Sequence, residues 1–217
     1  MSISTQSAAL ILTIPFIGTT LGSACVFLMR GALSRRLEHF LLGFASGVMT
    51  AAAVWSLLLP SIDQSASEGM GKLAAIPAGI GVAAGMLALL GLDNLIPHLH
   101  LNSDNPEGVH SELGRKTMLC LAVTIHNIPE GMAPGILIAG LMSGSEGMTI
   151  GAALTLAVGL AIQNFPEGAV ISMPLAGGGT GKFRAFVMGT LSGAVEPIAG
   201  ILTIFFASSF ISMMPFF

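Results

Sequence analysis

Residues 117–141 read TMLCLAVTIHNIPEGMAPGILIAGL, and this stretch decides the fold. Its 25 residues contain one acidic side chain, Glu130, and no lysine or arginine. A helix that crosses the hydrocarbon core of a bilayer needs about 20 mainly apolar residues. The stretch is therefore predicted to be a membrane-spanning helix that carries a glutamate inside the membrane.

Five further apolar blocks surround this stretch, at residues 8–29, 38–60, 74–96, 148–173 and 184–210. Of the 217 residues in the chain, 53% are hydrophobic and only 9% are charged. Soluble domains carry about 25% charged residues, since charge must cover a water-facing surface. The sequence thus predicts an all-α polytopic membrane protein, with one transmembrane domain of six helices over residues 1–217 in a lipid bilayer.

The positive charges predict an orientation. Seven of the eight lysines and arginines fall in the first, third and fifth loops, at Arg30, Arg35, Arg36, Arg115, Lys116, Lys182 and Arg184. Cytoplasmic loops are enriched in these residues, so we expect the odd-numbered loops in the cytoplasm and both termini outside. No positive residue precedes Arg30, so we expect the first block to be kept as a helix and not cleaved as a signal peptide.

Composition also excludes some classes of function. The net charge is −3 and no basic face is present, which argues against nucleic acid as a partner. Cys25 and Cys120 lie far apart, in or at the edge of apolar blocks. Their placement predicts neither a disulfide framework nor a Cys-x-x-Cys metal site.

Glycines at a spacing of four predict close helix packing. Small residues at this spacing let membrane helices approach each other. Such pairs occur at Gly43 and Gly47, Gly81 and Gly85, Gly131 and Gly135, and Gly189 and Gly193. We therefore expect the six helices to form a tight bundle.

Three glutamates lie deep inside apolar blocks: Glu130, Glu167 and Glu196. A charged side chain at the centre of a bilayer costs about 2.5–3.5 kcal/mol even on insertion scales. Protonation, or hydrogen bonds to neighbouring helices, is a sufficient explanation for one such residue. It is a poor one for three in the same half of the chain, each next to a proline.

A repeated motif contains the first two glutamates. Residues 126–131 read HNIPEG and residues 163–168 read QNFPEG, in adjacent blocks that are expected to run antiparallel. In each motif the first residue and the glutamate are four apart, so they share a helix face. Each proline also disturbs the bond to the carbonyl four residues earlier, which frees an oxygen to line a polar cavity. The candidate site residues are His126, Asn127, Glu130, Gln163, Asn164, Glu167 and Glu196.

Imidazole, carboxylate and amide groups together predict a site for a divalent cation such as Zn²⁺, Fe²⁺, Mn²⁺ or Co²⁺. Two glutamates neutralise one such ion, and the third leaves room for a second ion or a proton. An intramembrane metal-dependent hydrolase is the alternative, with Glu130 or Glu167 as general base. The His-Glu-x-x-His helix that such enzymes usually carry is absent from the sequence.

At these residues the sequence resembles the ZIP (Zrt/Irt-like) metal transporters. Residues 126–131 and 163–168 match the family's fourth- and fifth-helix motifs, residues 42–49 (LGFASGVM) are similar to its second helix, and residues 192–197 (SGAVEP) to its sixth. Gln163, where many members have histidine, indicates the GufA-like branch. The resemblance implies a transporter and not an enzyme. It would move Zn²⁺, or related ions including Cd²⁺, toward the cytoplasm as substrate, with no cofactor.

The resemblance also implies roles for the residues. His126, Glu130 and Glu167 would hold the principal ion, while Asn127, Asn164 and Glu196 would complete a second position. Gln163 would be a weaker and harder ligand than histidine. The implied setting is a bacterial inner membrane. ZIP relatives tend to be dimers, so a homodimer is implied, although the sequence leaves the oligomeric state open.

One departure from the family concerns helix number. ZIP proteins typically have eight spanning helices, so with six apolar blocks we expect the last two to be absent from this chain. Truncation, a split gene or a partner chain would each account for this. A non-transporting fragment that needs a partner is therefore a third alternative, in which the site is intact and its movement is impaired.

Three histidines, His98, His100 and His110, lie in the third loop. They either collect the exiting ion or are ordinary loop residues, and the sequence favours neither. Asp93 and Asn94, at the end of the third block, either line the exit or form an interfacial cap.

Overall fold

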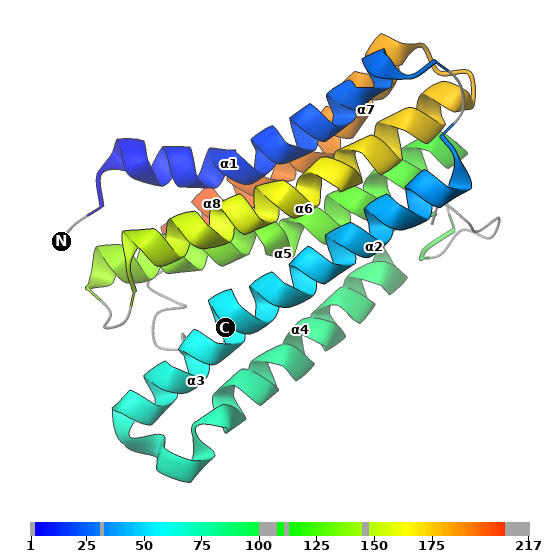
Figure 1. Ribbon diagram of the computed structural model, residues 1–217. Helices are drawn as coiled ribbons and strands as arrows, with labels where there is room; N and C mark the ends of the chain where they lie inside the picture. Colours follow the sequence, from blue (N-terminus) through cyan, green and yellow to red (C-terminus); the bar gives the residue numbers. More distant parts are fainter. Residues whose placement is uncertain (1–2, 31–32, 100–107, 111–112, 145–147, 207–217) are drawn as a thin grey trace.

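The computed structural model describes residues 3–30, 33–99, 108–110, 113–144 and 148–206. Nearly all of these residues are helical, which confirms the all-α prediction (Figure 1). The α-helices are α1 (Thr5–Ala24), α2 (Arg35–Ala52), α3 (Leu59–Ser65), α4 (Ala75–Leu95), α5 (Arg115–Ser143), α6 (Ile150–Gly177), α7 (Lys182–Gly193) and α8 (Val195–Phe205).

In the described residues, five helical stretches are long and apolar enough to cross a membrane: Thr5–Leu28, Arg35–Leu73, Ala75–Leu95, Ile150–Gly177 and Lys182–Phe205. Helix α5 is as long, at 29 residues, and it packs against α6 (Figure 1). Its mean hydropathy is lower, because the HNIPEG motif places several polar residues at its centre. These helices make the chain an integral membrane protein.

Helical structure in the second apolar block continues beyond the expected end at residue 60. It continues through a π-helical turn at Ala53–Leu58, helix α3 and a second π-helical turn at Ala66–Met70, and a 3₁₀ turn at Gly71–Leu73 follows. Two glycines within these last turns interrupt the helix and redirect the chain toward α4. Gly69 and Gly71 have φ values of +93° and +52°, in the left-handed region that side chains disfavour.

The sixth block is divided into α7 and α8 at Ala194. Pro197 is the physical reason, since it has no N–H to donate to the carbonyl four residues earlier, that of Gly193. Proline is tolerated in the first turn of a helix, and Pro197 lies in the first turn of α8. Glu196 lies in the same turn, where the positive end of the helix dipole favours a carboxylate.

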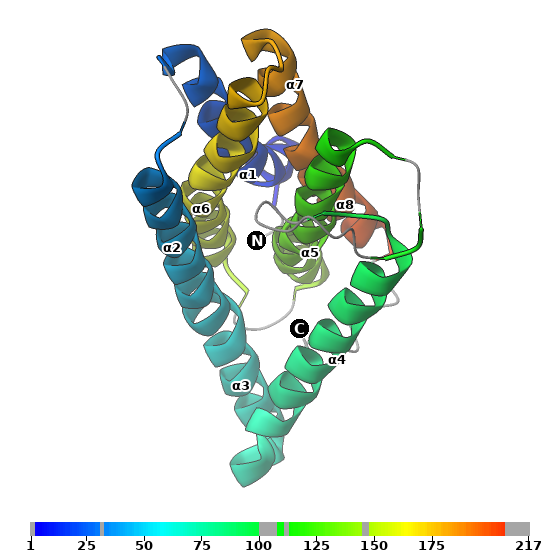
Figure 2. The ribbon, with the colours of Figure 1, turned by 90° about the vertical axis from the view of Figure 1, so that its right-hand side faces the viewer.

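The helices form two groups (Figures 1 and 2). Helices α1, α5, α6, α7 and α8 pack together around an apolar core that includes Leu12, Ile138 and Leu156. Helices α2, α3 and α4 form a hairpin, with α2 against α6 and α3 against α4. In Figure 2 the two arms of this hairpin diverge from their shared tip toward the bundle.

The glycines show which of these helix pairs are in close contact. A Cβ added at Gly131 or Gly135 would overlap the backbone of α8, and one added at Gly189 or Gly193 would crowd side chains of α1. A Cβ at Gly43, in α2, would meet nothing within 4 Å among the described residues, and the same holds at Gly47 and Gly85. Tight packing by glycine therefore applies to the five-helix group and not to these positions of α2 and α4.

Candidate metal centre

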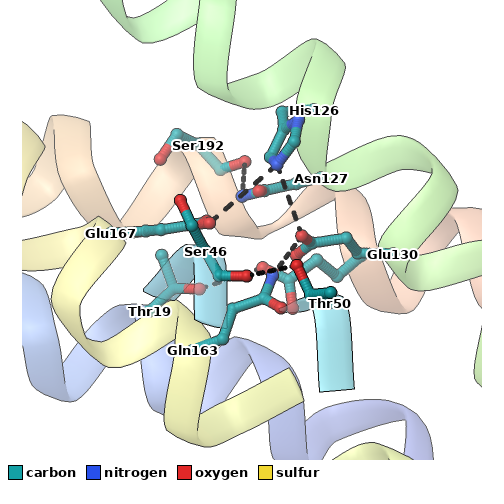
Figure 3. Close-up of polar contacts among 10 residues, drawn as sticks. Thr19, Ser46, Thr50, His126, Asn127, Glu130, Gln163, Glu167 and Ser192 are labelled. Atoms are coloured by element: carbon teal, nitrogen blue, oxygen red, sulfur yellow. Dashed lines mark hydrogen bonds and ion pairs between the residues drawn. The ribbon is translucent and has the colours of Figure 1, made fainter. Parts of the chain in front are cut away.

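Helices α5 and α6 bring three side chains of the two motifs together (Figure 3). His126 Nε2 lies 3.6 Å from Glu130 Oε1 and 4.0 Å from Glu167 Oε1. Ligand atoms of all three residues lie within 4.8 Å of one another. His126 is 43% exposed, whereas the side chains of Glu130 and Glu167 are 9% and 12% exposed, so the group is open on the histidine side.

These distances suit a single cation. Zinc binds histidine nitrogen and carboxylate oxygen at about 2.0–2.2 Å, so two ligands of one tetrahedral ion lie about 3.4 Å apart. The separations of 3.6 and 4.0 Å are within a few tenths of an ångström of that value. His126, Glu130 and Glu167 can therefore hold one ion if their ligand atoms, which lie within 4.8 Å of one another, move closer together.

The same region contains buried oxygens without a hydrogen-bond partner among the described residues. Each comes from a residue of the candidate site: Asn127 Oδ1, Glu130 Oε2, Gln163 Oε1, Asn164 Oδ1, Glu167 Oε2 and Glu196 Oε2. A buried polar atom without a partner costs about 1–3 kcal/mol. Such a concentration of lone pairs and negative charge is unfavourable unless protons, water molecules or a metal cation bind there.

Two amide residues use their nitrogen within the protein. The Gln163 side-chain nitrogen donates a hydrogen bond to Glu130 Oε1. The Asn127 side-chain nitrogen donates to the main-chain carbonyl of Ser192 at 3.1 Å (Figure 3). Both amide oxygens are therefore directed away from these bonds and are free to face a cation. The bond from Gln163 also orients Glu130, which the motif alone does not indicate.

Asn164 and Glu196 are buried beside this group and do not belong to the three-residue cluster. Asn164 is 0% exposed and Glu196 is 1% exposed. Glu196 Oε1 accepts a hydrogen bond of 2.9 Å from the hydroxyl of Thr19, in α1. The structure thus brings helices α1, α5, α6 and α8 to one polar region inside the bundle.

The glycine that follows each motif glutamate explains the packing around the region. A Cβ at Gly131 would overlap the carbonyl oxygen of Glu196, so the backbones of α5 and α8 touch there. A Cβ at Gly168 would overlap the carbonyl oxygen of Thr19, so α6 touches α1 in the equivalent way. Each Pro-Glu-Gly segment therefore places its glutamate beside a contact with a neighbouring helix.

Two residues of this region were not identified from the sequence, Thr19 and Ser192. The sequence does contain a signal for Thr19. Gly18-Thr19 and Gly22-Ser23 are two small-and-polar pairs four residues apart in an otherwise apolar block. This spacing predicts one closely packed face of α1 that carries hydroxyl groups.

Near the end of α4, Asp93 Oδ1 lies 3.5 Å from Nε2 of the buried His98. The Asn94 side chain donates to the carbonyl of Leu90, within its own helix. His100 lies outside the described residues, and His110 is exposed. Among the described residues at this end of α4, Asp93 and His98 thus lie next to each other, and both are residue types that can bind a metal ion.

Comparisons with known proteins show relatives over most of the chain. No protein-family model matches the chain. The human zinc transporter ZIP11 is 31% identical over an alignment that covers 86% of this chain and 76% of the human protein. The zinc transporter ZIPB of Bordetella bronchiseptica is 34% identical, over 92% of this chain and 62% of its own length.

The zinc transporter GufA of Myxococcus xanthus is 28% identical, over 91% of this chain and 76% of its own length. Relatives with this degree of identity over most of the chain share its family. They are transporters, which argues against the hydrolase alternative and against an enzyme of any kind. The chain therefore belongs to the ZIP family of membrane metal transporters, in its GufA-like branch.

Proposed function

We propose that this protein carries Zn²⁺ across the membrane toward the cytoplasm, and that His126, Glu130 and Glu167 are ligands of the transported ion. One observation carries the proposal. Two proline-containing motifs on neighbouring helices bring an imidazole and two carboxylates within 4.8 Å of one another inside the bundle. The names of the relatives support zinc as the substrate.

Electrostatics explains why the site needs a cation. Two charged carboxylates within 4.8 Å of each other repel by at least about 3.5 kcal/mol at an effective dielectric constant of 20. A divalent ion between them turns this repulsion into attraction and leaves the group with no net charge. The ion also gives the buried, unpaired oxygens of the site a positive partner. Binding of the ion therefore stabilises the folded protein.

Further oxygens allow a second ion position next to the first. Asn127 Oδ1, Asn164 Oδ1 and Glu196 Oε2 are buried and have no hydrogen-bond partner in the part of the chain that the structure describes. We assign these three oxygens, together with the shared glutamates, to that second position. Gln163 supports the first position, chiefly because its nitrogen holds Glu130.

The proposed setting is a bacterial inner membrane, with the odd-numbered loops in the cytoplasm. Large apolar side chains on the outer faces of the helices suit contact with lipid, among them Leu10, Leu21, Met86 and Leu87. With this orientation, Asp93 and His98 lie on the cytoplasmic side of the candidate site, where they are suited to receive the leaving ion. A homodimer is the proposed assembly.

Metal flux tests the proposal. The full chain is reconstituted in liposomes that enclose a dye sensitive to the ion tested, one for Zn²⁺ and Cd²⁺ and another for Mg²⁺, and that ion is added outside. We expect the dye to respond to Zn²⁺ and Cd²⁺ several times faster than in protein-free liposomes, and no acceleration with Mg²⁺, which prefers six oxygen ligands. Binding of zinc without flux would contradict transport, and equal rates for all three ions would contradict a selective site.

A further inference from the structure

The hydroxyl of Thr19 makes an unusual contact for a threonine in an apolar helix. Such hydroxyls ordinarily donate to the carbonyl four residues earlier in their own helix. Four others in this chain do so, at 2.7–2.8 Å: Thr13 to Ala9, Thr50 to Ser46, Thr124 to Cys120 and Thr203 to Ala199. Thr19 instead donates to Glu196 Oε1 at 2.9 Å, across 177 positions of sequence.

Close packing fixes Thr19 in this arrangement. Its side chain lies against Gly193, where an added Cβ would come within 2.8 Å of Thr19 Cβ, Cγ2 and Oγ1. Its backbone lies against Gly168, the residue after Glu167. A β-branched side chain has few rotamers, and contacts on both sides leave this one little freedom. Thr19 thus packs α1 against α6, through Gly168, and against α7, through Gly193, at the level of the candidate site.

The contact has a direct consequence for Glu196. Thr19 and Glu196 are both 1% exposed, so water does not compete for the bond. One carboxylate oxygen, Oε1, is occupied by the threonine, while Oε2 has no hydrogen-bond partner among the described residues. The carboxylate is therefore held in one orientation, in which Oε2 is free of hydrogen bonds within the described residues.

We propose that Thr19 is a positioning residue for metal binding, which holds Glu196 so that its Oε2 is presented to the ion. This inference rests on the proposed function, since it assumes that Glu196 faces the transported metal. Hydrogen bonds that orient metal ligands typically contribute about 10–100-fold to metal affinity. Thr19 lies on a helix from which the motifs predict no site residue, so its role follows from the three-dimensional contact.

Zinc titration of the purified full chain tests the proposal, by competition with a fluorescent chelator. Thr19→Val keeps the shape and removes the donor, and we expect affinity for Zn²⁺ to fall about tenfold. Thr19→Ser keeps the donor and should bind within about twofold of the unmodified protein. Equal affinities for the valine variant and the unmodified protein, or equal losses in both variants, would overturn the proposal.

A double-mutant cycle separates positioning from a structural role. In the background Glu196→Gln, the Thr19→Val change should alter zinc affinity by less than about twofold, because the oriented carboxylate is already lost. A full tenfold loss in that background would show that Thr19 acts on the fold. If Thr19→Val does not fold, Thr19→Ala takes its place, with the same expected loss and the same comparison to serine.

Glu130→Gln in the same titration distinguishes an error in the candidate site from an error in the proposed role of Thr19. If Glu130→Gln lowers zinc affinity and Thr19→Val does not, the candidate site stands and the role of Thr19 is refuted. If Glu130→Gln binds zinc as the unmodified protein does, the proposed site itself is wrong, whatever the result for Thr19.

Discussion

Replacing Glu130 with alanine is expected to abolish zinc transport in liposomes. Glu130 is one of the three residues whose ligand atoms converge, and it also accepts the hydrogen bond from Gln163. Loss of residues that only orient metal ligands typically costs about 10–100-fold in affinity, so loss of a ligand should cost at least about 100-fold. The variant should also lose the rise in melting temperature that saturating zinc gives the unmodified protein, because stabilisation by a ligand follows its affinity.

Two variants control for this result. Glu130→Gln preserves volume and a hydrogen-bonding oxygen, removes the charge, and should show the same loss. Glu68→Ala removes an exposed carboxylate that accepts a hydrogen bond from Gln64, far from the motifs in sequence, and should transport normally. Zinc flux above the protein-free level in both Glu130 variants would show that this carboxylate does not bind the transported ion.

A Gly131→Ala substitution is expected to be almost as severe, although it changes no polar group. The added Cβ would overlap the carbonyl oxygen and Cα of Glu196, and backbone atoms cannot rotate away as a side chain can. Overpacking a closely packed interior typically costs about 1–3 kcal/mol. We therefore expect a lower melting temperature, and loss of most zinc flux because Glu196 is displaced with the start of α8.

Gly159→Ala is the matched control for this prediction. Gly159 lies in α6, and a Cβ added there would meet nothing within 4 Å among the described residues. Its melting temperature and flux should equal those of the unmodified protein. If both alanine variants behave alike, the close approach of α5 and α8 beside the site is wrong.

Much of the fold follows from composition and periodicity, because a chain with so little charge must place its helices in lipid. The positions of the apolar blocks follow from hydropathy, but their ends do not. The helix through α2 and α3 continues past the expected end at residue 60 and is interrupted near Gly69, since its end depends on the backbone angles of Gly69 and Gly71. Pro197 predicts that the sixth block is interrupted near Ala194. A proline alone, however, does not show whether the result is one kinked helix or two separate helices.

The candidate site, too, could be predicted from the sequence only in part. Spacing on a helix is a local property, so the motifs alone are sufficient to propose His126, Glu130 and Glu167, whose ligand atoms lie within 4.8 Å of one another; that they bind a metal stays a prediction. Glycine spacing predicted the close contacts of Gly131 and Gly193 correctly, but it predicted the same for Gly43, which has none among the described residues. Spacing shows that a helix can approach another, whereas the arrangement of helices decides whether it does. The contact between Thr19 and Glu196 joins distant parts of the chain, which a local pattern cannot specify.

Anomalous diffraction from crystals of the full chain with bound zinc tests the central claim most directly. Data collected on both sides of the zinc absorption edge locate the ion independently of any assumption about its ligands. We predict a peak at about 2.0–2.2 Å from His126 Nε2 and from one carboxylate oxygen each of Glu130 and Glu167. A zinc peak elsewhere in the bundle, with none between these three residues, would contradict the account.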